Sequence, residues 1–309
     1  MTDTTHIPTP RVPVQPRSLI GAAFLRRYER EPYEPRQRRY FTPSDAGRCA
    51  RQISFKLFGA RADDKPVAPT QRYNMGLGQA IEDIVTAQLE SEYGDAIACQ
   101  VKISQRLATK HGPLSVYGFA DYCIDLPEGR EVWDLKTTGN YGYGEKVAGS
   151  DNRGVVTAPE GPGDEHVLQT AIYGGLLGAD AIGVSYISRD PLGGYKANTP
   201  YITNDELLVT ADFRFPMEEV ADAASDELDR QAGIMRRVEA GTIAKRIIPG
   251  CGEITGWDAK GMGVWTDRTG RQRTDWACRY CDFRERCETY EPGVHVFIRR
   301  ETDAPERTK

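Results

Sequence analysis

Hydrophobic residues recur along the chain at two different spacings, and the spacing changes from one segment to the next. Between residues 76 and 90 the apolar side chains lie three or four positions apart, which predicts an amphipathic helix. These side chains are Leu77, Ile81, Ile84, Val85 and Leu89. Three runs rich in β-branched and aromatic residues follow at 97–107, 114–124 and 131–137, and they predict three strands.

A glycine-rich loop at 139–163 separates these strands from a second group of elements. An apolar stretch predicts a helix over 165–177, and the run 182–188 predicts another strand. Residues 215–239 predict an amphipathic helix with acidic residues early and basic residues late, as the helix dipole favours. The order α-β-β-β-α-β predicts an α/β fold: one mixed sheet with helices on both faces.

The remaining segments set the expected domain boundaries. Residues 1–17 are polar and proline-rich and predict a disordered arm, and residues 301–309 predict a charged tail. One domain is expected over 18–300, beginning with a short helix at 18–30. The glycine-rich segment 250–276 is expected to be irregular, with a hairpin that turns at Asp267–Gly270.

Net charge adds little to the choice of function. The 309 residues include 40 Lys and Arg against 45 Asp and Glu, a net charge of −5. Nucleic-acid-binding proteins usually carry a basic excess, but a local basic groove is sufficient. The first 60 residues contain such an excess, and the alternative is that these arginines are ordinary solvated side chains. They include Arg26, Arg27, Arg36, Arg38, Arg39, Arg48 and Arg51.

The chain begins without an apolar signal segment, and its longest apolar run, 171–187, is short for a membrane span and contains Asp180. We therefore expect a cytoplasmic protein that does not associate with membranes.

Asp121 is the first polar residue at an unexpected position. If the side chains of the strand alternate, Asp121 shares a largely apolar face with Tyr117, Phe119 and Cys123. A carboxylate there requires a partner, because burying an unpaired charge costs several kcal/mol or more. A metal ion is one such partner, and a hydrogen-bonded structural role is the alternative.

Two further polar pairs follow Asp121 along the chain. Asp134 and Lys136 are two residues apart on the next strand, so both lie on one face. Together they can hold a cation and present an ammonium to a phosphate. The alternative is an ordinary ion pair. Gln169 and Tyr173 lie one helical turn apart. They can donate hydrogen bonds to a phosphate or orient the lysine, or they are a structural pair.

Seven cysteines in a chain with no export signal favour metal binding in a reducing compartment over disulfides. Cys278, Cys281 and Cys287 form a C-x2-C-x5-C run. A four-thiolate site needs one more ligand, for which Cys49 is the natural candidate and Cys251 the alternative. Such a site holds either an iron–sulfur cluster or a structural Zn²⁺.

Four short motifs, in this order along the chain, resemble the RecB-like branch of the PD-(D/E)XK nucleases. They are Gly78–Glu82, Gly118–Asp121, Asp134–Thr137 and Gln169–Tyr173. The resemblance extends from about residue 42 to 290 and implies a restriction-endonuclease-like core. Ala120 replaces the proline that names the superfamily, a common departure. Glu82 stands where many members carry histidine, which leaves the number of metal ions and the choice between Mg²⁺ and Mn²⁺ open.

The resemblance implies that Glu82, Asp121 and Asp134, with the carbonyl of Leu135, bind Mg²⁺ or Mn²⁺, and that Lys136 orients or deprotonates the attacking water. The implied activity is exonucleolytic hydrolysis of DNA, preferably at single-stranded ends, in recombination, repair or DNA-fragment processing. Recombination or DNA-capture proteins would be its partners. The alternatives are a structure-specific endonuclease, a non-catalytic DNA-binding adaptor and a metal-stabilised interaction module.

One cysteine far upstream and three near the C-terminus resemble the iron–sulfur nucleases among the CRISPR-associated exonucleases and the AddB-type nuclease domains. This resemblance implies a [4Fe–4S] cluster that joins residue 49 to residues 278–287 beside a basic, aromatic DNA channel. The residues expected to contact DNA are Arg48, Arg51, Arg279, Tyr280, Phe283 and Arg284.

Overall fold

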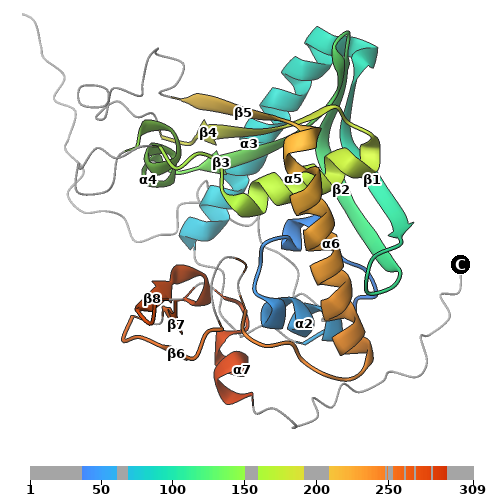
Figure 1. The fold of residues 1–309 in the computed structure, drawn as a ribbon. Coiled ribbons are helices and arrows are strands. Elements are labelled where there is room, and N and C mark those ends of the chain that lie inside the picture. Colours follow the sequence, from blue (N-terminus) through green and yellow to red (C-terminus); the bar gives the residue numbers. More distant parts are fainter. Residues whose placement is uncertain are drawn as a thin grey trace, which may run out of the picture.

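A five-stranded sheet forms the centre of the protein (Figure 1). The computed structural model describes residues 37–60, 69–149, 159–190, 209–247, 249, 253–260, 262–267, 269–279 and 281–290. The strands follow one another in chain order as β1 (Ile97–Leu107), β2 (Leu114–Leu126), β3 (Gly129–Thr138), β4 (Ala181–Ser188) and β5 (Thr210–Pro216). Only β3 and β4 are parallel, and a parallel pair requires a long crossover.

The crossover contains the helix that packs on one face of the sheet. Helix α5 (Asp164–Leu177) lies between β3 and β4 in the chain, and its Tyr173 packs against Ile103, Ala120 and Val132 of three strands. Helix α6 (Met217–Glu239) packs alongside α5 (Figure 1).

Helix α3 (Pro69–Tyr93) crosses the opposite face of the sheet. Gly78 lies so close to β3 that a Cβ atom built there would be 2.8 Å from Thr137 Oγ1. A side chain at position 78 would push α3 away from the strand, which accounts for glycine here.

Shorter elements complete the described part of the chain. The 3₁₀ helix η1 (Pro43–Asp45) and helix α2 (Ala50–Phe58) precede α3. The others are η2 (Gly94–Ala96), α4 (Asn140–Tyr143), the π-helical turn η3 (Gly144–Ala148), the small antiparallel sheet β6 (Gly256–Trp257), β7 (Gly263–Thr266) and β8 (Gln272–Asp275), the 3₁₀ helix η5 (Trp276–Cys278), and α7 (Arg284–Thr289). None of the described helices combines the length and hydrophobicity needed to span a bilayer.

The predicted mixed α/β architecture is confirmed, with differences at the element ends. Strand β5 and helix α2 were not predicted, and the helix expected from residue 215 begins at Met217. Pro216 explains this boundary, because the residue before a proline is driven toward extended conformations and away from the helix. The expected helix at 18–30, the arm and the tail lie outside the described residues.

The pleat of the β1–β2 hairpin breaks at one point. Cys99 pairs with Tyr122 and Val101 with Ala120, so Gln100 and Asp121 are left out of the regular register. Gln100 has φ +50°, the left-handed conformation that a residue with a Cβ avoids. The side-chain alternation consequently shifts here, and Cys123 packs with Ala120 and Val132 against α5. The expectation that Cys123 shares a face with Tyr117 and Phe119 is therefore wrong.

Candidate active site

The three acidic residues singled out in the sequence come from three elements that meet where β2 and β3 separate. Glu82 lies on α3, Asp121 on β2 and Asp134 on β3. Regular pairing of β2 with β3 stops at Tyr122 and Trp133. Beyond this point the Leu135 N–H donates to Asp121 Oδ2 at 3.0 Å, so the Asp121 carboxylate spans the gap between the strands.

Asp134 is the most deeply buried member of the site, with 1% of its surface exposed. Gln169 Nε2 donates to its Oδ1 at 2.9 Å, and Lys136 Nζ lies 2.5 Å from its Oδ2. Burial raises the pKa of Asp134 to about 7; the negative charge of Asp121 adds to the increase, and the Lys136 ammonium opposes it. The two carboxyl groups are close enough to hydrogen bond with each other.

Glu82 and Asp121 are bridged by a residue that sequence reasoning did not identify. Gln100 Nε2 donates to Glu82 Oε1 at 2.8 Å and lies 3.4 Å from Asp121 Oδ1. Burial raises the pKa of Glu82, and the charge of Asp121 raises it further. The unfavourable backbone of Gln100 is what directs its amide at both acids, and no pattern in the sequence indicates a positive φ at a glutamine.

Tyr173 has a different contact from the one expected. Its side chain is 2% exposed and hydrogen bonds with the backbone of Phe119, while its hydroxyl approaches Gly118. The ring thus supports β2 from the α5 side. The expectation that it faces a phosphate or the lysine together with Gln169 is wrong, whereas Gln169 does reach Asp134.

No protein-family model and no curated protein matches this chain. Several solved structures are similar to it, including the following two. The crystal structure of SSO0001 is 14% identical with a TM-score of 0.47, and the alignment covers 86% of this chain and 95% of that chain. A phage-related exonuclease from Haemophilus somnus 129PT is 14% identical with a TM-score of 0.35, over 62% of this chain and 81% of that chain. Because both TM-scores lie below 0.5, we infer the function from the site itself.

The donor atoms of this site suit a hard cation, since carboxylate and backbone oxygens are the ligands that Mg²⁺ and Mn²⁺ prefer. Asp134 Oδ2 is buried and accepts no well-directed hydrogen bond. Among the described residues, however, no group of three or more His, Cys, Asp or Glu side chains is arranged to hold a metal. The carboxylates are held by neighbouring side chains: the Gln100 amide contacts Glu82 and Asp121, and the Lys136 ammonium lies against Asp134.

His166 is a second residue that sequence reasoning missed. It is one turn ahead of Gln169 on α5, and its Nδ1 lies 2.6 Å from the Tyr186 hydroxyl. Burial lowers the pKa of His166 to about 3, and the charges of Lys136, Lys146 and Arg48 lower it further. The imidazole is therefore neutral, and three cations lie close enough to influence it.

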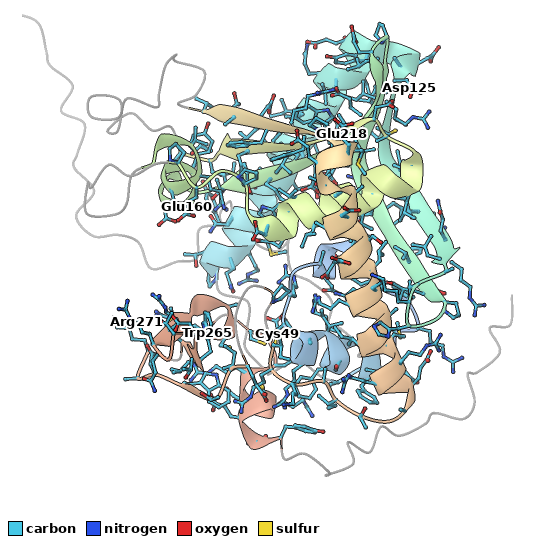
Figure 2. All side chains as sticks on the ribbon, viewed as in Figure 1. Cys49, Asp125, Glu160, Glu218, Trp265 and Arg271 are labelled. Carbon is cyan, nitrogen blue, oxygen red and sulfur yellow. The ribbon has the colours of Figure 1, made fainter. Side chains whose placement is uncertain are left out.

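The four cysteines expected to act together do line one pocket. Cys49, Cys278, Cys281 and Cys287 all border the same pocket, together with Arg51, Arg246, Phe55 and Trp257. Cys49 directly precedes α2 and lies beside the C-terminal segment (Figure 2). Burial raises the pKa of Cys281 to about 11, and the neighbouring Cys49 and Cys287 contribute. The alternative ligand Cys251 lies outside the described residues.

The pocket also contains donors suited to an anionic group. Arg51 Nη1 lies 3.9 Å from Cys287 Sγ, and the Phe283 N–H donates to Cys281 Sγ at 3.5 Å. Arg246 Nη1 is buried and has no hydrogen-bond partner among the described residues. A guanidinium here would offset the negative charge of thiolates. Among the described residues, however, these cysteines are not arranged as a metal-binding group.

Two of the expected DNA contacts are wrong. Phe283 is 4% exposed and packs against Phe55 and Tyr290, so neither face of its ring is free for a base. Arg51 is 8% exposed, donates to the Ala244 carbonyl and stacks on Tyr290. Both side chains belong to the cysteine pocket.

The other four residues expected to contact DNA differ in exposure and in pairing. Arg48 and Arg279 are exposed, and Arg284 pairs with Glu288 at 2.8 Å. Tyr280 lies outside the described residues. Arg48 and Arg279 are thus the two whose exposed side chains suit contact with DNA.

Proposed function

We propose that this protein is a metal-dependent DNA nuclease that acts as an exonuclease on single-stranded ends. One observation carries the proposal: a buried carboxylate, Asp134, lies against a second carboxylate and a lysine ammonium where two strands separate. Burying like charges together is unfavourable unless a cation joins them. An acidic site with an adjoining lysine suits metal-assisted phosphodiester hydrolysis.

Each residue has a distinct role in this proposal. Glu82, Asp121 and Asp134, with the Leu135 carbonyl, would hold Mg²⁺ or Mn²⁺, which supplies an activated water and stabilises charge on the phosphate. Lys136 offsets negative charge in the transition state or takes the proton of the attacking water. Gln169 holds the Asp134 carboxylate in place. His166, being neutral, accepts or donates one hydrogen bond without adding charge.

The cysteine pocket has a structural role in the same proposal. Four thiolates would hold a [4Fe–4S] cluster, which the sequence resemblance favours over zinc, and would join residue 49 to the C-terminal segment. The preceding residue, Arg48, influences His166 at the acidic site, whereas Cys49 borders the cysteine pocket. Fixing Cys49 would therefore also position the turn that contains Arg48.

Incubation of the purified protein with end-labelled DNA tests this function. We expect Mg²⁺ or Mn²⁺ to support cleavage, chelator to abolish it, and single strands to be degraded from their ends. A ladder that starts at an internal branch would indicate the structure-specific endonuclease instead. Sequence-independent binding with no product under any metal condition would leave a non-catalytic DNA-binding adaptor.

Replacing Gln100 with glycine is expected to separate stability from activity. Glycine adopts a positive φ freely, so the change should stabilise the fold by about 1 kcal/mol. The same change removes the amide that positions Glu82 and Asp121, so affinity for Mn²⁺ and the rate of cleavage should fall together. Gln105→Gly, on the same strand with an ordinary backbone, should instead destabilise the fold and leave Mn²⁺ affinity unchanged. Unchanged Mn²⁺ affinity in Gln100→Gly would exclude a positioning role.

A further inference from the structure

A row of three aromatic rings on and beside β2 leads toward the acidic site, and the two outer rings are exposed. The ring centroids of Tyr117 and Phe119 are 5.8 Å apart, and that of Tyr40 is 5.3 Å from Tyr117. Tyr40 and Phe119 are 37% and 42% exposed. Single apolar residues are common on protein surfaces, but contiguous rings form a continuous apolar surface that indicates a binding site.

The backbone holds the aromatic row in place. Phe41 is buried, its N–H donates to the Ser115 carbonyl, and its own carbonyl accepts from the Tyr117 N–H. The segment that contains Tyr40 therefore runs beside β2 as an additional short strand pairing. The rings are presented by sheet backbone rather than by a loop, so their spacing is set in advance.

The neighbouring positions of β1 are cationic. In the hairpin register Lys102 lies opposite Phe119, Ser104 opposite Tyr117, and Arg106 opposite Ser115, so these side chains share one face. Lys102 Nζ is 5.8 Å from the centroid of the Tyr117 ring. These three pairs contain two cations and no acid, in a chain whose net charge is −5.

The aromatic row ends next to the acidic site. Phe119 is two residues from Asp121 on β2, and Lys102 is two residues from Gln100 on β1. Two residues of strand span about 7 Å. A chain that lies along the row would therefore come close to Asp121, which neighbours Gln100 and, through it, Glu82.

We propose that Tyr40, Tyr117 and Phe119 form a stacking surface for the unpaired bases of the DNA strand that enters the active site, with Lys102 and Arg106 contacting its phosphates. The proposal rests on the proposed nuclease function and adds the choice of substrate. Bases inside a duplex already stack on each other and offer no free face, so this surface selects single strands without reading sequence.

Charge distinguishes DNA from a second copy of this chain as the occupant. Charged residues are depleted in the core of protein interfaces, whereas each phosphate of a DNA strand gains from a nearby cation, so two exposed cations beside the rings favour DNA. Phe283 and Tyr280, the aromatic residues first expected to stack bases, lie in the cysteine segment. The aromatic row presents exposed rings, whereas the ring of Phe283 is buried and cannot stack on a base.

The test is binding in the presence of chelator, so that no DNA is cleaved. Affinity is measured for a short oligothymidylate and for an abasic chain of the same length, which has the phosphates without the bases. The wild-type protein should prefer the oligothymidylate. Phe119→Ala should weaken oligothymidylate binding about five-fold or more and leave abasic binding unchanged. Phe119→Trp should keep the preference, and Lys102→Ala should weaken both ligands equally and reduce the salt dependence.

Tyr93→Ala is the matched control, because Tyr93 is 39% exposed but lies at the end of α3. Equal effects of Phe119→Ala and Tyr93→Ala on oligothymidylate binding would overturn the proposal. So would a dimer that Phe119→Ala dissociates without any change in base-dependent affinity. Cleavage in Mg²⁺ is measured separately. Base-dependent binding without cleavage would support the stacking surface and contradict the nuclease function. Cleavage without base-dependent binding would support the nuclease function and contradict the stacking surface.

Discussion

Replacing Lys136 with alanine should reduce metal-dependent cleavage of DNA by about 100-fold or more, while affinity for DNA measured with chelator stays within about two-fold. The ammonium lies 2.5 Å from Asp134 and is the cation closest to that carboxylate among the described residues. It acts on charge that develops in the transition state, so its loss should lower kcat rather than raise KM.

Removal of the ammonium also leaves Asp134 buried without its counter-charge, which can destabilise the protein. Lys136→Gln separates the two effects, because the amide fills most of the space and still donates a hydrogen bond to Asp134. Lys110→Ala is the control: Lys110 pairs with Asp229 on the surface, with 72% of its side chain exposed. Cleavage by a folded Lys136→Gln variant at close to the wild-type rate would remove the lysine from the chemistry.

Protein purified without oxygen is expected to be brown and to contain about four irons per chain. Cys281→Ala should lose the colour and the iron. A link between residue 49 and the C-terminal segment encloses a very long loop, for which closure entropy gives roughly 5 kcal/mol of stabilisation. The melting temperature should therefore fall by about 10 °C.

Cys99→Ala is the control for the cysteine pocket, because Cys99 lies on β1 near Glu90 and does not border the pocket. It should retain iron, colour and melting temperature. One zinc per chain without iron would replace the cluster by a structural zinc site and leave the nuclease proposal intact. Retention of all metal in Cys281→Ala would show that this thiol is not a ligand.

The order of the elements was predictable because it depends on local patterns. A period of two or of about 3.6 residues is visible in any short window, and it located β1 to β4 and most of α3, α5 and α6. Strand β5 was missed although Ala211, Phe213 and Phe215 alternate. Its seven residues lie directly before a strong helical pattern, which was extended backward across Pro216.

The chain order of the acidic motifs also indicated which polar residues belong together. Asp134, Lys136 and Gln169 meet as expected, because D-x-K spacing places two side chains on one face of a strand and the crossover helix returns over it. Tyr173 does not join this group. It lies one helical turn beyond Gln169 and packs over β2, where Gly118 leaves room for its hydroxyl.

The sequence by itself determined the α/β class, the motif residues and the run of Cys278, Cys281 and Cys287, because spacing along one segment decides these features. That Cys49 lines the same pocket was decided by the tertiary structure. Only the tertiary structure decided what depends on two distant segments at once. Gln100 reaches Glu82 and Asp121 because the pleats of two strands break opposite each other. Phe283 is buried because Phe55 packs on it, and Phe119 is exposed because no described element covers that half of the hairpin. Burial and strand register depend on contacts between segments, so the periodicity of a single segment cannot predict them.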